Sequence, residues 1–419
     1  MRASKGGSGD VEIVFDRNTY EGRPSPLIPS VVFYPGGRGH KSGEEVVVGS
    51  KAKSMINVKP RNVIYNAKRF IGRNWIEPSI KSQSSSHNFQ VSENVMTNNN
   101  KNITLSGMNF VIDDTNRNIT LSPEQVGSHI LTHLLDILKL HLGHGQVKNA
   151  VVAVPAKFNT QQRQATGLAF KLAGLKVTRM LEEPTAAALA YGLHRKPGVD
   201  HILVYDFGGG TLDVSVLHVS EGFVEVIGSS GDDLLGGADF DVSVAEFIKD
   251  KYGEVFKSSV DDEDICYSNG DCHNKNNDND STAAGEVTYD SIGSTPFCTN
   301  ANLFPISEKL KIILSNSQNI ATEQCLSLTN NEKVSLTITL DEYNKAVAPL
   351  LNRASQPIID VLEELELTSE DIDEVVMVGG TSRMPQVREL VKKTLDKGSL
   401  NTSIDPDITV AYGCASVID

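Results

Sequence analysis

The chain has 419 residues, of which 39 are lysine or arginine and 53 are aspartate or glutamate, so its formal net charge at pH 7 is −14. Hydrophobic residues make up 39% of it, and no apolar run approaches the ~20 residues that span a bilayer. This composition predicts a globular protein of two lobes or domains, without a membrane span and without a basic surface for nucleic acid.

The first confident helix in chain order begins after residue 122. Ser122, Pro123 and Gln125 form the pattern of a capped helix start, with a proline at the first helical position and a glutamine three residues after the cap. Apolar residues then recur at helical spacing as far as Leu142, where glycines follow. We therefore expect an amphipathic helix between Ser122 and Leu142.

A strand–helix–strand unit follows. Residues 150–154 form a short apolar run, Asn159 and Gln162 resemble a helix cap, Gly174 ends that helix, and residues 177–181 form a second apolar run. Two strands joined by a helix predict a parallel pair.

The strongest local signal for chemistry lies within residues 201–217. An apolar run delivers Asp206, then Gly208, Gly209 and Gly210 form a turn without side chains, and Thr211 adds a hydroxyl before Asp213. Backbone N–H groups in such a turn can approach a phosphate, and carboxylates beside it suit Mg²⁺ held through its waters. A structural hairpin that uses the glycines for its turn is the alternative. A protein kinase is excluded, because the other kinase motifs are missing.

Two further glycine turns occur later in the chain. Residues 374–378 form a strand that runs into Gly379 and Gly380, with a helix beginning near Pro385, which is a geometry typical of nucleotide sites but also of a capped helix alone. At residues 236–241, Asp239 as a helix N-cap is favoured over a phosphate-facing turn.

Taken together and in order, five motifs resemble the ATPase domain of the heat-shock protein 70 family. They are residues 154–159 with 162–166, 183–188 with 190–192, 206–215, 236–241, and 378–383. The resemblance covers almost the whole chain. It implies an α/β, actin-like ATPase fold, in which two lobes with ribonuclease H-like mixed sheets enclose a nucleotide cleft. It also implies that residues 1–196 form lobe I, that 197–401 form lobe II with a disordered insertion at 258–294, and that 402–419 return to lobe I.

The resemblance assigns roles to individual residues. It places Lys68, Glu183, Asp206 and Thr211 in catalysis, with Asp206 also holding hydrated Mg²⁺, and Pro155, Arg163 and Glu183 in a relay between lobes. The residues implied in nucleotide binding are Gly208, Gly209, Gly210, Gly236, Gly237, Glu308, Lys311, Ser315, Gly379, Gly380, Arg383 and Asp407. The implied cofactors are ATP or ADP and Mg²⁺, and the implied partners are co-chaperones or nucleotide-exchange factors.

The sequence departs from the family pattern in several places. A first phosphate loop of the type Gly-Ile-Asp-Leu-Gly-Thr-Thr is missing, and residues 10–14 are expected to form the strand that would follow it; a truncated gene model would explain this. Ile312 stands where many members have an arginine that stacks on adenine, and Ala238 replaces an acid. Adenine affinity is therefore in question.

The resemblance is greatest to a branch that consists of the ATPase core alone, the microsomal stress-70 type, because no peptide-binding domain follows. That branch implies the endoplasmic reticulum lumen, with the cytoplasm as the alternative. The sequons at Asn102, Asn118, Asn279 and Asn401 permit a lumenal location, and Cys266 with Cys272 could close a small loop in an oxidising compartment.

Two functions remain open. The first is a slow ATPase core that is not regulated by bound peptide. The second is a non-catalytic, two-lobed module that binds co-chaperone partners and binds nucleotide weakly or not at all. A sugar or acetate kinase on the same fold is disfavoured, because the motifs match the chaperone branch.

Overall fold

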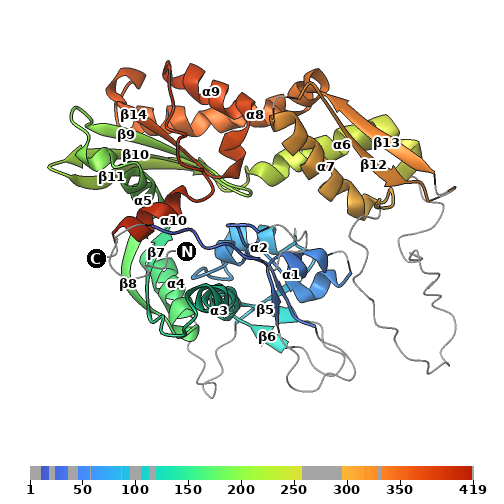
Figure 1. Cartoon of the computed structure of the whole chain (residues 1–419), viewed down its shortest axis with the longest axis horizontal. Helices are drawn as coiled ribbons and strands as arrows, with labels where there is room; N and C mark the ends of the chain where they lie inside the picture. Colours follow the sequence, from blue (N-terminus) through green and yellow to red (C-terminus); the bar gives the residue numbers. More distant parts are fainter. Residues whose placement is uncertain are drawn as a thin grey trace.

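The computed structural model describes residues 11–17, 24–35, 46–56, 58–85, 87–94, 105–112, 119–256, 295–316, 318–328, 330 and 332–417. The predicted insertion at 258–294, the Cys266–Cys272 loop and the sequons at Asn102, Asn118 and Asn279 lie outside these residues. Figure 1 shows two assemblies of helix and sheet, one above the other. We call the lower one, with β1–β8 and α1–α4, the first lobe, and the upper one, with β9–β14 and α6–α9, the second lobe.

The first lobe contains two small antiparallel sheets, in the orders β2-β1-β3 and β4-β5-β6. Buried aromatic rings of this lobe, among them Phe70, Phe89 and Phe110, pack edge to face in one core cluster. The elements of this region are β1 (Val32–Phe33), β2 (Val47–Val48), α1 (Ser50–Ser54), η1 (Pro60–Asn62), β3 (Val63–Ile64), η2 (Ala67–Arg69), α2 (Pro78–Ser85), β4 (Gln90–Glu93), β5 (Met108–Ile112) and β6 (Ile119–Leu121).

The predicted parallel pair of the first lobe is confirmed. β7 (Asn149–Val154) and β8 (Lys176–Glu182) run parallel and are joined by α4 (Thr160–Leu172). Both predicted capping boxes form, at Ser122 before α3 (Pro123–Leu142) and at Asn159 before α4, so the side chains at these positions satisfy the first free amides of each helix.

The strand predicted at 10–14 is wrong for the described part of it, because residues 11–15 form no ladder and only Asp16 makes an isolated bridge to Ser25. A strand needs a hydrogen-bonding neighbour along its length. This segment instead contacts α3 through side chains: Val14 packs with Leu138, and Glu12 lies 3.0 Å from His141.

The second lobe is built on a mixed sheet of order β11-β10-β9-β14. The predicted hairpin and third strand are confirmed as β9 (His201–Phe207), β10 (Leu212–Ser220) and β14 (Glu374–Val378), with β14 parallel to β9 and the other pairs antiparallel. β11 (Phe223–Asp232) forms the edge.

Alternation along β9 divides the sheet between two cores. Leu203 and Tyr205 face the larger core with α6–α9, whereas Ile202 and Val204 face a second core with α5. The other elements of the second lobe and its connections are α5 (Glu183–Ala190), η3 (Leu193–Arg195), α6 (Gly237–Phe256), α7 (Asn300–Ser315), β12 (Ile320–Leu326), β13 (Lys333–Thr339), α8 (Leu340–Glu364), η4 (Ser369–Asp371), η5 (Gly380–Arg383), α9 (Pro385–Leu395) and α10 (Thr409–Ser416).

Helices α5 and α10 lie together between the two lobes (Figure 1). Their approach is close at Gly413, where a Cβ atom would lie 1.7 Å from the carbonyl oxygen of Ala186. None of the helices in the described residues is long and apolar enough to cross a membrane.

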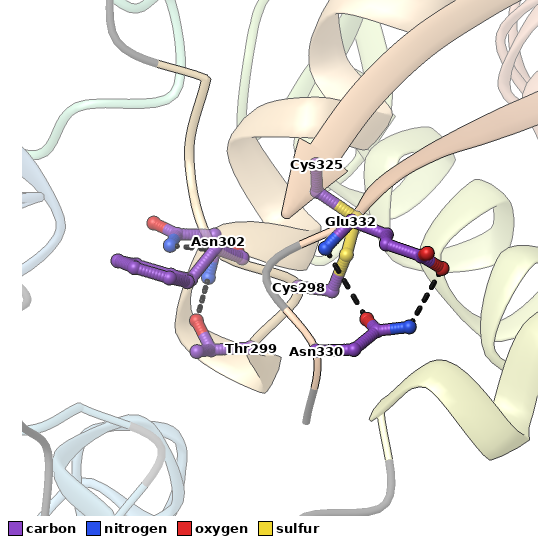
Figure 2. The surroundings of a disulfide bond; sticks show 7 residues. Cys298, Thr299, Asn302, Cys325, Asn330 and Glu332 are labelled. Atoms are coloured by element: carbon purple, nitrogen blue, oxygen red, sulfur yellow. Dashed lines mark hydrogen bonds between the residues drawn. A yellow bond between two sulfur atoms is a disulfide. The ribbon is translucent and has the colours of Figure 1, made fainter. Parts of the chain in front are cut away.

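A disulfide that the sequence did not predict joins Cys298, just before α7, to Cys325 in β12 (Figure 2). Both cysteines are fully buried. Backbone hydrogen bonds hold the same junction, since the Cys298 N–H donates to Leu326 O at 2.8 Å and the Leu326 N–H donates to Pro296 O at 2.8 Å. The start of α7 is therefore fixed to the β12–β13 hairpin.

Candidate functional site

The candidate site contains two aspartates from neighbouring strands. Asp206 continues the face of β9 that holds Ile202 and Val204, so its carboxyl group is directed to the side of the sheet that α5 covers. Asp213 of β10 is its direct partner in the antiparallel register and shares that face. Strand alternation and register thus place two carboxyl groups side by side.

Glu183 brings a third carboxyl group to this point from the first turn of α5. Pro184 follows it, and the positive end of the helix dipole favours an acid there. The Nζ atom of Lys68 lies 2.6 Å from Glu183 Oε1. The structure thus brings together three of the residues assigned to catalysis: Lys68, Glu183 and Asp206.

The position of Lys68 depends on the local fold of η2. Asn66 before it has a φ of 57°, a left-handed conformation that turns the chain sharply. Ala67 and Phe70 on either side of the turn are buried, which leaves Lys68 directed away from the core. Its side chain is 61% exposed, whereas that of Glu183 is 18% exposed.

The charges of this cluster shift one another's titration. Burial raises the pKa of Asp206 to about 7, and the negative charge of Glu183 adds to this while Lys68 opposes it. Burial and Glu183 also raise the pKa of Asp213. Although the Lys68 side chain is partly exposed, desolvation by the surrounding protein acts to lower its pKa; the charges of Glu183, Asp206 and Asp213 outweigh this, so the pKa is raised. One lysine does not balance three carboxylates.

A cavity of about 10 Å³ lies among these groups, lined by Pro155, Glu183, Asp206 and Asp213 with five neighbouring residues. This is roughly the space of one water molecule. The excess of carboxylate charge favours a divalent cation bound beside the cluster, and the cavity has room for one water molecule between such a cation and the carboxylates. In the described parts of the chain, no three acidic, histidine or cysteine side chains converge as direct metal ligands. That Asp206 holds Mg²⁺ through water stays a prediction.

The glycine loop between β9 and β10 holds two amides without a hydrogen-bond partner among the described residues. The Gly208 N–H donates to Thr211 O at 3.0 Å, while the N–H groups of Gly209 and Gly210 make no hydrogen bond among the described residues. Such unpaired amides are the donors that a phosphate group binds. The Thr211 side chain lies at the end of the same loop, where the sequence placed it.

The Gly236–Gly237 turn supports this loop from beneath. The amides of Gly237 and Ala238 donate to Gly208 O at 3.1 Å and Gly209 O at 2.9 Å, respectively. A Cβ atom on Gly236 would lie 2.3 Å from the Gly210 nitrogen, so only glycine fits. The prediction that Asp239 is the N-cap of α6 is wrong. The helix begins at Gly237, and the Asp239 carboxylate accepts the Gly236 N–H at 2.7 Å from inside the first turn.

On the side predicted to hold adenosine, Lys311 of α7 reaches Gly237. Its Nζ atom donates to Gly237 O at 2.9 Å and lies 2.7 Å from the buried Asp241 carboxylate of α6. The Thr381 hydroxyl of η5 donates to Gly208 O at 2.9 Å. These contacts join α6, α7, η5 and the glycine loop into one connected unit of the second lobe.

Two other α7 residues assigned to adenosine are occupied by protein contacts. The Glu308 carboxylate lies 3.4 Å from the Nζ atom of Lys53 in α1, and this ion pair joins the second lobe to the first. The Ser315 hydroxyl donates to the carbonyl of Lys311 in its own helix at 2.9 Å. Ile312, where the family often has an arginine, is 50% exposed.

The turn after β14 carries the remaining nucleotide-binding candidates. Gly379 has a φ of 81°, and a Cβ atom there would lie 2.3 Å from Phe207 O, so glycine is required. A Cβ atom on Gly380 would lie 3.0 Å from Asp407 Oδ1. The Asp407 carboxylate accepts hydrogen bonds from Arg383 at 2.9 and 3.2 Å, and Asp405 also binds Arg383. The structure thus brings Gly380, Arg383 and Asp407 together.

The residues predicted to relay nucleotide state are only partly in contact. Pro155 and Glu183 line the same cavity. Arg163 instead forms a 2.8 Å ion pair with Glu182, the neighbour of Glu183, and donates to Phe158 O at 2.8 Å. Arg163 is therefore connected to Glu183 only through Glu182, the preceding residue of the chain.

Sequence reasoning missed several residues of the site. Asp213 was expected, with Asp206, to be a carboxylate beside the loop that suits Mg²⁺, but its direct pairing with Asp206 was not predicted, although the spacing of the two residues across a short hairpin could have indicated it. Asp241, Lys53 and Arg69 carry no such signal, because their partners lie far away in the sequence.

Comparisons with known proteins agree with this architecture. The sequence model of the family described as "Hsp70 protein" matches residues 9–267 and 300–418. Two similar curated proteins, each named "Chaperone protein dnaK", come from Guillardia theta (37% identity over 390 residues) and Cyanophora paradoxa (36% identity over 390 residues). Each alignment covers 92% of this chain but only 53% and 54% of the relative. The chain thus spans about half the length of the curated relatives it matches.

Proposed function

The chain belongs to the Hsp70 family and has its actin-like ATPase fold, and from this we propose that it binds ATP with Mg²⁺ and hydrolyses it slowly in the cleft between its lobes. The observation that carries the proposal is the cluster of Lys68, Glu183, Asp206 and Asp213 beside two unpaired glycine amides. Phosphoryl transfer to water needs a cradle for the phosphates, charge neutralisation and an aligned water; here the amides supply the cradle, Lys68 and a bound cation the positive charge, and the small cavity a place for the water.

Each group has a distinct part in the proposal. The Gly209 and Gly210 amides bind phosphate oxygens, with Thr211 adding a hydroxyl, and Lys68 brings positive charge to the transferred group. Glu183 and Asp206 hold and orient water at the small cavity between them. Mg²⁺, when bound, would supply charge neutralisation at the phosphates, with Asp206 as its partner through water.

The division of the chain into lobes is part of the same proposal. We place residues 1–196 in lobe I, 197–401 in lobe II and 402–419 back in lobe I, and the packing of α10 against β7 of the first lobe, as well as against α5, supports the return. Pro155, Arg163 and Glu183 lie where α5 meets the first lobe, so a change in the nucleotide can pass between lobes there. Adenosine would lie against Glu308, Lys311, Ser315, Gly379, Gly380, Arg383 and Asp407.

The alternative is a non-catalytic module that keeps the two-lobed shape and binds co-chaperones or nucleotide-exchange factors. Two observations favour it: Ile312 replaces the arginine that many members stack on adenine, and the Ser315 hydroxyl is engaged by its own helix. The retained Lys68–Glu183 pair beside Asp206 and Asp213 opposes it, because a lysine and carboxylates gathered at the glycine loop are the groups that phosphoryl transfer uses.

We further propose an oxidising compartment such as the endoplasmic reticulum lumen, as for the microsomal stress-70 branch. The Cys298–Cys325 disulfide supports this, since such bonds persist in oxidising compartments. The Asn401 sequon gives no support, because its side-chain amide donates to Glu374 at 2.7 Å and Val375 O at 3.1 Å. Alkylation of thiols in cell fractions, followed by mass measurement, distinguishes this proposal from a cytoplasmic location with free thiols.

A single-turnover assay tests the ATPase proposal. Protein in excess over ATP is mixed with Mg²⁺, and phosphate release is followed for the wild type and for Glu183→Gln, which keeps the shape of the side chain but removes its charge. Release by the wild type that depends on Mg²⁺ and falls about 100-fold in the variant supports an ATPase. Absence of release by the folded wild type favours the interaction module.

A further inference from the structure

A second cation on η2 contacts the glycine loop from the opposite lobe. Arg69 follows Lys68 in sequence, and its Nη2 atom donates a hydrogen bond to the carbonyl oxygen of Gly210. Lys68 turns instead to Glu183. Two adjacent residues of the first lobe therefore contact two different parts of the cluster, the carboxylates and the phosphate-binding loop.

The backbone that presents Arg69 is firmly held. Phe70, the next residue, is fully buried and packs edge to face against Phe110 with ring centroids 5.4 Å apart. Ile71 is also buried, against Ala165 and Ala169 of α4. The guanidinium group therefore projects from a fixed point of the first lobe.

The carbonyl oxygens of the glycine loop are held from two sides. Gly208 O and Gly209 O accept from Gly237 and Ala238, which belong to the second lobe like the loop itself. Among the described residues, Gly210 O accepts a hydrogen bond only from Arg69. Within the described part of the chain, Arg69 thus links this loop directly to the first lobe.

The absence of a side chain at residue 210 permits this contact. A Cβ atom on Gly210 would lie 2.6 Å from Arg69 Nη2, too close for both to remain in place. The neighbouring Gly209 has no atom within 4 Å of its Cβ position. The contact therefore depends on glycine at one position of the loop and not at the adjacent one.

We infer that Arg69 is a positioning residue that fixes the second phosphate loop against the first lobe, so that the Gly209 and Gly210 amides and the Lys68 ammonium act on the same phosphoryl group. The inference rests on the proposed ATPase function. Catalysis by positioning is sensitive to displacements of about 1 Å, so a link between the lobes at the loop affects the rate more than the affinity. The guanidinium keeps its charge at any pH at which the protein is folded.

Two measurements test the inference with Arg69→Ala and Arg69→Lys. The first is amide exchange of Gly237 and Ala238 in the nucleotide-free protein, because these amides are protected by the loop. We expect exchange to become at least about threefold faster in Arg69→Ala and to return towards the wild-type rate in Arg69→Lys. The second is single-turnover hydrolysis, in which Arg69→Ala should lower the rate at least about tenfold while the Kd for ATP changes less than about threefold.

Arg73→Ala is the matched control, since this nearby arginine pairs with Glu77 and makes no hydrogen bond to the loop among the described residues. It should change neither measurement. In a double-mutant cycle, Arg69→Ala should have a smaller effect in a Gly210→Ala background, in which the added methyl group already displaces the guanidinium.

The two proposals fail separately. If the wild type does not hydrolyse ATP, the proposed function fails, while amide exchange still decides whether Arg69 positions the loop. Unchanged exchange in Arg69→Ala overturns the inference whatever the rate. Faster exchange with an unchanged rate, in an active wild type, overturns it as well, because the position of the loop then has no bearing on hydrolysis.

Discussion

Asp206 of β9 and Asp213 of β10 lie directly opposite each other in an antiparallel register, on the face of the sheet that meets α5. Like charges in such a pair repel, and Glu183 adds a third carboxylate beside them. Lys68 alone does not compensate this charge, so the cluster destabilises the free protein and favours a bound cation. The predictions below follow from this arrangement.

The titration of Asp206 should be visible in stability. Its pKa is raised to about 7 in the folded protein, chiefly by burial, so the protonated form stabilises the fold at low pH. This contribution should be lost between about pH 4 and pH 7 and stay level above that. In melting experiments without nucleotide, the stability of Asp206→Asn relative to the wild type should therefore increase as the pH rises across this interval. A difference between the two that does not change with pH would contradict the assignment.

Removal of the Lys68 ammonium should affect hydrolysis more than binding. Lys68→Ala is expected to lower the single-turnover rate about 100-fold or more and to change the Kd for ATP only a few-fold, because the charge acts on the transferred group. Lys51→Ala, in the exposed part of α1, is the control and should leave both values unchanged. Equal losses in rate and affinity would indicate simple binding instead.

Two glycines of the site should differ sharply in their tolerance of alanine. Gly236→Ala places a methyl group 2.3 Å from the Gly210 nitrogen, so we expect it to lower the free energy of unfolding by roughly 1–3 kcal/mol. Gly209→Ala meets nothing within 4 Å and should be nearly neutral. Urea denaturation of both variants checks this, and equal stability of the two would argue against the close packing of the loops.

The disulfide should stabilise the second lobe. It links residues 27 positions apart, and a loop of this length is expected to contribute about 3–4 kcal/mol. Reduction of the wild type should lower the midpoint of urea denaturation by the amount that this free energy corresponds to. The midpoint of the double variant Cys298→Ala/Cys325→Ala should not change on reduction. Cys414→Ala controls for the buried free cysteine. If the reductant leaves the wild-type midpoint in place, the bond does not form in solution.

Adenine affinity should respond to residue 312. Ile312→Arg adds a guanidinium to an exposed position of α7, and stacking on the base is expected to tighten ATP binding roughly two- to fivefold. Ile320→Arg, also exposed but in β12, is the matched control for added charge. Equal effects of the two substitutions in a titration would show that position 312 does not face the base.

Local signals in the sequence predicted the helices α3 and α4 and the parallel strand pair of the first lobe, and the central hairpin of the second lobe. The caps at Ser122 and Asn159, the parallel pair β7–β8 and the hairpin at 201–217 all formed where their residues indicated. Each depends on neighbours within about 30 residues, and so does the pairing of Asp206 with Asp213.

The errors lie where distant contacts decide the structure. Residues 11–15 have the composition of a strand but pack on α3, because a ladder depends on a partner that local sequence does not specify. The disulfide and the Lys53, Asp241 and Arg69 contacts likewise join segments whose proximity only the fold creates. Asp239 was predicted as the N-cap of α6 but lies at the third helical position. From there its carboxylate accepts a hydrogen bond from the amide of Gly236, the residue before the helix.

Calorimetric titration of the folded chain with MgATP tests the central claim most directly. We expect saturable binding at one site, weakened at least about tenfold by Asp206→Asn and by removal of Mg²⁺ with a chelator. Absence of binding by a chain that melts cooperatively, or binding that is indifferent to both changes, would contradict an ATPase site at Lys68, Glu183 and Asp206.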